Sequence, residues 1–417
     1  MSAGKYWSIF DQGISSASSF LLVLSIARGS DVKTVGQFLL AYLLYGFVLG
    51  VGRAIGGDVL LLRAAERPAE VDCDCRRLLG LALLLSVPTA SIFVIAALAV
   101  GGGALSTSLL ALALALAPVL FQDALRYCLF AQARPSLAAV NDSIWLAVQL
   151  ALTAALLLFS PDAGPAAFVL AWASGALVAA ALGIWQSGML PTRRDLRRWF
   201  TEDKGRVSSF FTDFAVMVGA ANVAVYLIAV IASVEDVAAV RGMLLLFSPL
   251  DALFVGIRIL TLPALVRAMT LGGASARRLA YLVALTSTLV TAVWALLIIA
   301  LPDSVGHAVL GATWDVAKPL TLAIAVASIA LYAALPLQAG LRALRDARRL
   351  VVLRAIQTAL LFIGVVAGTA LNAAQGAAQG LAIASVAGGL LWWRGFSQSS
   401  RAMAPPVARE PAAPERA

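Results

Sequence analysis

A chain of 417 residues that is 61% hydrophobic and only 13% charged departs from soluble domains, which have roughly 45–50% apolar and about 25% charged residues. No soluble fold of this length has an interior large enough to bury so much apolar surface. The formal net charge of +9 would suit nucleic acid, but the basic residues sit between apolar runs, which argues against that partner. The composition predicts an integral membrane protein.

The apolar runs have the length of transmembrane helices. Each contains about 20 residues rich in Leu and Ala, and none shows the ten-residue alternation of a membrane barrel. The first run carries Asp11 and lacks a cleavage-type ending, so we expect a retained span rather than a signal peptide. In chain order the predicted spans are 7–27, 37–61, 78–99, 104–125, 138–159, 165–188, 209–232, 240–264, 279–301, 318–341, 351–371 and 376–393. We therefore predict an all-α integral membrane protein with about twelve transmembrane helices.

Lys and Arg are distributed unevenly between the two sets of loops. Of the 31 basic residues, 25 fall in the N-terminus, the even-numbered loops and the C-terminus, four in the odd-numbered loops and two inside spans. Because cytoplasmic loops carry the excess of positive charge, both termini are predicted to be cytoplasmic. Arg outnumbers Lys by 27 to four and Ala is abundant, which is typical of a high-GC bacterial genome. We expect a multi-pass protein of the bacterial cytoplasmic (inner) membrane.

The two halves of the sequence resemble each other at an offset of 205 residues. IARGSDVKTVGQFLL (26–40) aligns with IASVEDVAAVRGMLL (231–245), and the same offset superposes Arg53 on Arg258. Six spans per half insert both halves the same way up, so they form two six-helix parallel-repeat lobes with the substrate route between them. The predicted domains are an N-terminal lobe (1–190), a basic cytoplasmic linker (191–206), a C-terminal lobe (207–396) and a disordered cytoplasmic tail (397–417).

Two arginines lie inside predicted spans at equivalent positions of the repeat. Arg53 is ten residues from Arg63 at the predicted cytoplasmic end of its span, which is about 15 Å along a helix. An intramembrane arginine costs at least ~2.5 kcal/mol, so it should face protein or a watery cavity. Its planar fork of donors suits a phosphate or pyrophosphate, which makes Arg53 and Arg258 the candidate substrate-binding residues. The alternative is a pair of structural ion pairs, with Asp58, Asp251 or Asp11 as the partner.

Several acids also lie in or near the predicted spans. A carboxylate in such a place could bind and release a proton or Na⁺, or it could simply neutralise the arginines. The candidates for ion coupling or for cavity acids are Asp11, Asp213, Asp251 and Asp58, and Asp123 is a further acid of this kind. We predict no catalytic residue, no cofactor and no metal site, since Cys73-Asp74-Cys75 offers two thiols without a nearby His.

Some other polar and aromatic residues have a simpler interpretation. Asn222 is predicted to form an interhelical hydrogen bond, and His307 to be solvated in an outward-facing loop. Aromatic residues near span ends are interpreted as membrane-interface anchors, namely Trp7, Trp185, Trp314, Trp392 and Trp393.

The sequence resembles the polysaccharide and oligosaccharidyl-lipid flippases of the multidrug/oligosaccharidyl-lipid/polysaccharide (MOP) exporter superfamily. The first span and its hairpin carry the resemblance in DQGISSASSFLLVLSIARGSDVKTVGQF, a serine-rich helix with an Ala-Arg ending and a loop closing on Gly-x-Phe. The segments LFQDALRYCLFAQARPSLAAVNDSIW and LQAGLRALRDARRLVVLRAIQT resemble the family's Arg-containing helix ends after spans four and ten.

The resemblance implies a transporter that flips a polyprenyl-(pyro)phosphate-linked saccharide across the membrane by alternating access, for cell-envelope polysaccharide export. Related lipid II flippases carry cavity arginines on spans two and eight, which implies a head-group role for Arg53 and Arg258. Those relatives also have arginines in span one, where this chain has Asp11 and Gln12, so peptidoglycan precursor is a poor candidate cargo. The expected partners are the lipid-linked glycan, membrane lipids, an H⁺ or Na⁺ coupling ion and glycan-assembly enzymes. We expect a monomer.

Other functions are compatible with parts of the sequence. A cation-coupled multidrug exporter of the same superfamily would favour an acid-lined cavity, whereas the arginine pair favours an anionic head group. A major-facilitator transporter would have a basic Asp-Arg motif after span two, where this chain reads GGDVLLLRAAERP. A membrane enzyme of glycan assembly would need larger outward loops than these. A non-transporting scaffold with the same fold is a further alternative.

Overall fold

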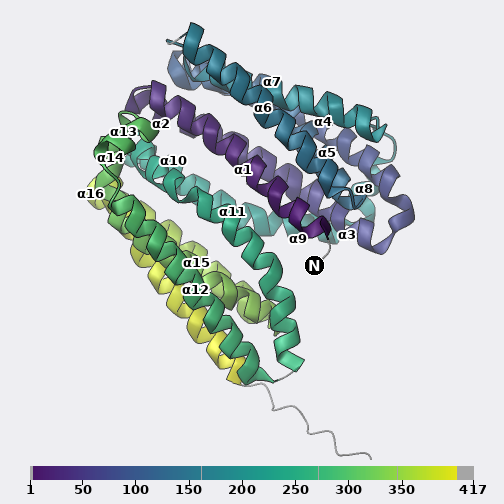
Figure 1. Ribbon diagram of the computed structural model, residues 1–417, viewed down its shortest axis with the longest axis vertical. Helices are drawn as coiled ribbons and strands as arrows, with labels where there is room; N and C mark the ends of the chain where they lie inside the picture. The colour runs from purple at the N-terminus through teal and green to yellow at the C-terminus, as the bar shows by residue number, and fades with distance from the viewer. Residues whose placement is uncertain (1–2, 161, 271, 345, 402–417) are drawn as a thin grey trace, which may run out of the picture. The chain divides into compact units, whose positions relative to one another are not determined.

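The structure, a computed structural model, describes residues 3–160, 162–270, 272–344 and 346–401. Within these ranges every regular element is a helix (Figure 1). The end of the predicted tail, residues 402–417, lies outside them. The all-α class predicted from the sequence is therefore confirmed.

The helices follow the predicted spans, with longer ends. The elements are α1 (Ala3–Gly29), α2 (Val32–Gly52), the π-turn η1 (Arg53–Gly57), α3 (Asp58–Glu66), η2 (Pro68–Glu70), α4 (Val71–Val100), α5 (Gly103–Ala131), α6 (Pro135–Phe159), α7 (Pro165–Ser187), α8 (Leu196–Glu202), α9 (Lys204–Phe214), the π-turn η3 (Ala215–Gly219), α10 (Ala220–Ile231), α11 (Val234–Thr270), α12 (Gly273–Ile299), α13 (Asp303–Leu310), α14 (Thr313–Ala317), η4 (Lys318–Leu320), α15 (Thr321–Ala343) and α16 (Ala347–Arg401).

The described residues contain ten helices that are long and apolar enough to cross a membrane. One of them, α16, is two helices joined at Asn372 and Ala373, whose backbone angles are not helical. The eighth predicted span, 240–264, lies within α11, which is 37 residues long. With α16 counted as two helices and α11 included, the described chain has the twelve spanning segments that the sequence predicts.

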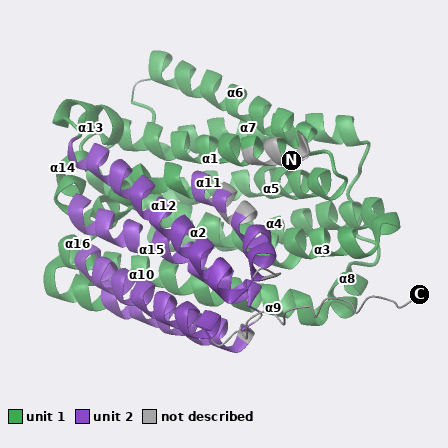
Figure 2. Cartoon of the chain, turned by 60° about the horizontal axis from the view of Figure 1, so that its bottom comes forward, with its two compact units in different colours: residues 1–252, 301–320, 366–377 green, residues 253–300, 321–365, 378–417 purple. Residues whose placement is uncertain are grey.

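The chain forms two compact units (Figure 2). Unit 1 comprises Met1–Ala252, Leu301–Leu320 and Val366–Ala377, and unit 2 comprises Leu253–Ala300, Thr321–Val365 and Ala378–Ala417. In unit 1, α5 is the central helix and packs on α2, α4 and α7, while α6 packs on α1 and α7. The segment α9–η3–α10 lies along α2 and η1.

Two side chains of α10 form hydrogen bonds with the backbone of α2 within unit 1. The Asn222 amide lies 3.5 Å from the Leu43 carbonyl oxygen, so the predicted interhelical hydrogen bond is present. The Tyr226 hydroxyl donates to the Leu40 carbonyl oxygen at 2.9 Å. Both bonds end on backbone carbonyls, which fixes the two helices side by side without a charged pair.

In unit 2, α12 packs against α15 around buried Leu265, Leu337, Trp392 and Phe396. The Trp392 indole N–H donates to Gln357 Oε1 at 2.7 Å. Trp392 is therefore a core residue, and its interpretation as a membrane-interface anchor is wrong. The same correction holds for Trp314 of unit 1, which is buried and donates to Asp303 Oδ1 at 2.9 Å. In both cases a side-chain acceptor within the protein satisfies the indole N–H, so the ring need not reach the interface.

Candidate functional site

The second spanning segment widens into a π-turn where Arg53 lies. In this turn the Asp58 backbone N–H donates to the Arg53 carbonyl oxygen, five residues back, instead of following the α-helical pattern. Gly57 lies inside the turn and lets its backbone approach α5, because a Cβ there would lie 2.6 Å from the Tyr127 ring. Such turns are rare and occur frequently at functional sites.

Arg53 forms a forked ion pair with Asp123 of α5. Its Nη2 lies 2.6 Å from Oδ1, and its Nε lies 3.0 Å from Oδ2. The Arg53 side chain is 36% exposed, whereas the Asp123 side chain is 10% exposed. The guanidinium is thus held on one side by a buried carboxylate and open on the other.

The open side of this ion pair borders a pocket in unit 1. The cavity is small, with a volume of about 20 Å³. Gly46, two turns before Arg53, has open space where a Cβ would be, and Gly52 meets one Leu120 methyl at 4.0 Å. The lining residues are Leu49, Gly52, Arg53, Gly57, Leu78, Leu81, Ala82, Leu85, Leu120, Asp123, Ala124 and Tyr127. The pocket is a narrow apolar cavity with one ion pair at its wall.

A second arginine, Arg126, lies one turn from Asp123 and is buried. Its Nε donates to Asp11 Oδ2 of α1 at 2.7 Å, and its Nη2 donates to Gln12 Oε1 at 2.8 Å. The same guanidinium lies 3.7 Å from both Asp123 and Asp142. Arg126 lies just beyond the predicted span 104–125, but α5 extends through it to Ala131. The ion pair with Asp11 makes this burial tolerable.

Together these side chains form a polar network, here called the Asp/Arg cluster and defined as Asp11, Arg53, Asp123, Arg126 and Asp142. Gln122 adds a hydrogen bond to Asp142 Oδ1 at 2.6 Å. Among the described residues, Asp11 Oδ1 and Asp142 Oδ2 accept no hydrogen bond. Three carboxylates face two guanidiniums, so the cluster carries a surplus negative charge when all are ionised. Burying an uncompensated charge is costly, and a proton or a cation removes that cost.

The predicted site residues are divided between this cluster and other places. The cluster contains Asp11 and Arg53, and Asp58 lies half-buried at the start of α3, within electrostatic range of Arg53. Asp213 on α9 and Asp251 on α11 have exposed side chains. Arg258 lies in α11, and its side chain is outside the described residues.

The ion-pair partner of Arg53 differs from the ones that the alternative interpretation offered. That interpretation named Asp58, Asp251 or Asp11, whereas the observed partner is Asp123, since α5 packs on η1. Asp142 is the missed member of the cluster. Its position within the predicted span 138–159 was a usable signal, because an acid inside a span seldom lacks a function or a partner.

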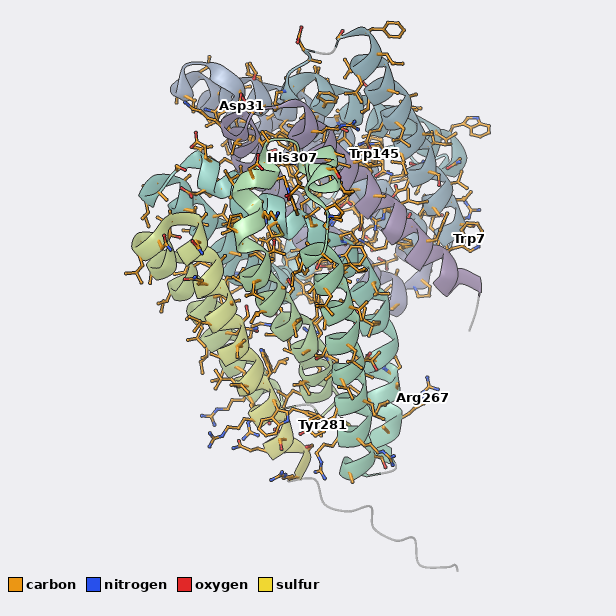
Figure 3. The ribbon with its side chains drawn as sticks, turned by 60° about the vertical axis from the view of Figure 1, so that its left-hand side comes forward. Trp7, Asp31, Trp145, Arg267, Tyr281 and His307 are labelled. Atoms are coloured by element: carbon orange, nitrogen blue, oxygen red, sulfur yellow. The ribbon has the colours of Figure 1, made fainter. Side chains whose placement is uncertain are left out.

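A separate polar network lies in the hairpin between α12 and α15. His307 Nε2 lies 2.9 Å from Asp315 Oδ1, and this hydrogen bond raises the pKa of His307. The Lys318 ammonium, 2.6 Å from Asp303 Oδ1, and the Trp314 indole N–H lower the pKa of Asp303. His307 is exposed, as predicted, and lies at the same end of unit 1 as Asp31, with Trp7 toward the other end (Figure 3).

Comparison with known proteins identifies the fold but no sequence family. No family model matches the chain, and no curated protein matches its sequence. A MOP superfamily transporter from Pyrococcus furiosus, whose binding pocket of reversed polarity is said to suggest a different function, has a TM-score of 0.63, 14% identity and 95% coverage of both chains. An inward-facing multidrug resistance MATE family transporter of the MOP superfamily gives 0.66, 12% identity and 97% coverage of both. An outward-facing multidrug resistance MATE family transporter has a TM-score of 0.62 and 12% identity, and the match covers 95% of this chain and 96% of that chain. The chain thus has the fold of MOP superfamily transporters.

Proposed function

We propose that the protein is an alternating-access exporter of an amphiphilic anion, a polyprenyl-(pyro)phosphate-linked saccharide, and that Arg53 holds its phosphate. The observation that carries this proposal is the half-open Arg53–Asp123 pair at the wall of an apolar pocket. A guanidinium fork binds phosphate through two parallel charge-assisted hydrogen bonds. The side chains around this ion pair are mostly apolar, which is compatible with a phosphate attached to a lipid.

The proposed binding step is an exchange of partners. An incoming phosphate takes the Nε and Nη2 donors that Asp123 accepts in the structure. Asp123 is then a buried carboxylate that has lost its strongest partner, with Arg126 Nη1 3.7 Å away. Taking up a proton removes its charge, so cargo binding and proton binding favour each other. Loss of that proton restores the Arg53–Asp123 pair and releases the cargo.

The same cluster can take up a proton, with Asp11, Asp123 and Asp142 as the acids that share it. Because this proton binds together with the cargo, it neutralises the occupied site and does not itself drive export. The surplus negative charge of the cluster disappears when one carboxylate is protonated. Within the described ranges, no three Asp, Glu, His or Cys side chains converge closely enough to hold a metal ion.

The test is flipping of a fluorescent polyprenyl phosphate in proteoliposomes, with binding measured on the same protein. Arg53→Ala is expected to weaken binding about tenfold to a hundredfold, because it removes hydrogen bonds to a charged group. Arg53→Lys should recover only part of it, since an ammonium lacks the fork. Arg67→Ala, which removes an exposed arginine at the end of the same segment, is the matched control.

Arg53→Ala combined with Arg258→Ala should abolish flipping while membrane insertion persists, and unchanged flipping in that variant would refute the proposal.

A second candidate is a multidrug exporter. The solved structures that share the fold include multidrug resistance transporters, and surplus carboxylates could bind an organic cation. A fluorescent cationic dye separates the two functions. Dye transport that depends on Asp123 and survives Arg53→Ala would favour multidrug export over the lipid-linked saccharide.

A further inference from the structure

The segment that follows the first six spans, residues 191–206, is docked on unit 1 by one buried arginine. The Arg63 side chain of α3 is 2% exposed, and its Nη1 donates to Asp74 Oδ1 of α4 at 3.0 Å. Its other donors face the docked segment, with Nε 2.5 Å from Asp203 Oδ2 and Nη2 3.4 Å from Glu202 Oε2. A buried guanidinium needs partners for its donors, so these acids hold the segment in place.

A single aromatic side chain of this segment is buried beneath Arg63. Trp199 of α8 is 0% exposed, while every other residue of 191–206 is exposed or half-buried. The Arg63 guanidinium carbon lies 4.6 Å from the centroid of the Trp199 ring, in cation–π geometry. The position of Trp199 is therefore fixed from one side by Arg63.

The polar edge of Trp199 reaches the π-turn that carries Arg53. Its indole N–H donates to the Ile55 carbonyl oxygen at 3.0 Å. Ile55 is two residues after Arg53, within the same five-residue turn. The segment thus contacts the backbone of the candidate site itself.

We infer that Trp199 is a positioning residue, whose hydrogen bond to Ile55 holds the π-turn in the geometry that directs the Arg53 fork at Asp123. The chain of contacts runs from Asp203 and Arg63 through the indole to the turn. The transport consequence rests on the proposed function of Arg53, whereas the effect on the turn does not. A Trp that merely filled space could be replaced by Phe without consequence for the turn.

The docking of the segment does not depend on the indole N–H alone. The Thr192 backbone N–H donates to the Arg76 carbonyl oxygen at 2.9 Å. A Cβ on Gly80 would lie 2.0 Å from the Thr192 carbonyl oxygen, so the segment also lies directly against α4. Trp199→Phe keeps an aromatic face for Arg63, and we expect that variant to fold with the segment in place.

Hydrogen–deuterium exchange of the full-length protein in lipid nanodiscs tests the inference. Trp199→Phe should raise amide exchange about two- to tenfold in the peptide covering 53–60, which is the effect of losing one hydrogen bond. The control is Trp185→Phe at the end of α7, where the ring is 81% exposed, and this change should leave that peptide unaffected. If Trp199→Phe fails to fold, Trp199→Met removes the same donor with a more adaptable side chain.

The outcomes separate the inference from the proposed function. If the amides of residues 53–60 exchange at the wild-type rate in the variant that lacks the indole N–H, the inference is overturned, whatever the effect on transport. If exchange increases in Trp199→Phe but Arg53→Ala flips the cargo normally, the positioning role of Trp199 stands and the phosphate-binding role of Arg53 is refuted. If both hold, Trp199→Phe should raise the KM for the fluorescent polyprenyl phosphate more than it lowers the maximal rate. A lower rate at unchanged KM would contradict a positioning role at the binding site.

Discussion

The guanidinium of Arg126 contacts side chains of three helices, α1, α5 and α6. Its closest contact is with Asp11, which is fully buried and has one oxygen without a hydrogen bond among the described residues. This ion pair therefore supports a carboxylate that the structure satisfies only in part. Removing one partner of such a pair costs more than the pair contributes, because the other charge stays buried.

Arg126→Ala is expected to destabilise the protein by about 3–5 kcal/mol, the typical cost of breaking a buried pair. Thermal unfolding of the detergent-purified protein measures the loss. Arg126→Ala combined with Asp11→Asn should be more stable than Arg126→Ala alone, because the orphaned charge is gone. Equal stability of the two variants would show that Asp11 is not ionised in the folded protein.

For single residues, the sequence predicted which charged side chains lie inside a span better than it predicted which side chains they pair with. Arg53 was identified because a charge inside an apolar run is visible in the sequence, but its partner Asp123 is 70 residues away. That pairing depends on how α5 packs on η1, which no local pattern encodes. Arg63 and Arg126 each lie just beyond a predicted span, so the apolar pattern alone does not include them in a helix. In the structure, acids from other helices allow both arginines to be buried within helices.

Among the elements, the hairpin α13–α14 combines exposure with a dense set of charges. His307 is the only histidine in the chain, so its titration can be followed without assignment. The hydrogen bond to Asp315 raises the pKa of His307 in the folded protein above the ordinary value of 6.5. The stabilisation from this pair is thus present at low pH and is lost as the pH rises through the raised pKa.

NMR of the imidazole in the full-length protein should show a midpoint above pH 6.5. Asp315→Asn should lower the midpoint, because it removes the hydrogen-bonded carboxylate. The protection factors of the amides of residues 301–317, which are corrected for the intrinsic pH dependence of exchange, should fall with rising pH across the same window, and His307→Gln should abolish that fall. A midpoint at or below the ordinary histidine value would contradict the contact.

The docked segment 191–206 shows what composition alone misses about an element. Its six Lys and Arg residues predicted a basic cytoplasmic linker. The same stretch contains Glu202 and Asp203, which face the buried Arg63. Counting charges predicts a cytoplasmic loop, but the direction in which each charge points depends on the tertiary structure.

For the whole molecule, the number of spans was predictable because the membrane sets the length of each apolar run. The helix ends were not, since charged residues such as Arg63 extend helices beyond the apolar part. Lobe boundaries at 190 and 207 stay a prediction, and so does the sidedness of the chain. Sidedness follows from the 25 basic residues assigned to one face and four to the other.

Reporter fusions test this sidedness. Alkaline phosphatase, which is active only outside the cytoplasm, should be active when fused at Gly101 and inactive when fused at Arg67. A green fluorescent protein at the C-terminus should fluoresce, because that end is predicted to be cytoplasmic. The reversed pattern would overturn the predicted orientation and, with it, the direction of transport.

The π-turn at Arg53–Gly57 also determines the direction in which the side chains of α3, which follows it, point around the helix axis. One residue more or less in a helix rotates all later side chains by about 100° around its axis. Deleting one residue from this turn would restore an ordinary α-helix and turn Arg63 away from Asp74 and the docked segment. The wide turn therefore aligns two arginines, ten residues apart, with different neighbours, and single-residue deletions there should be tolerated far less than substitutions.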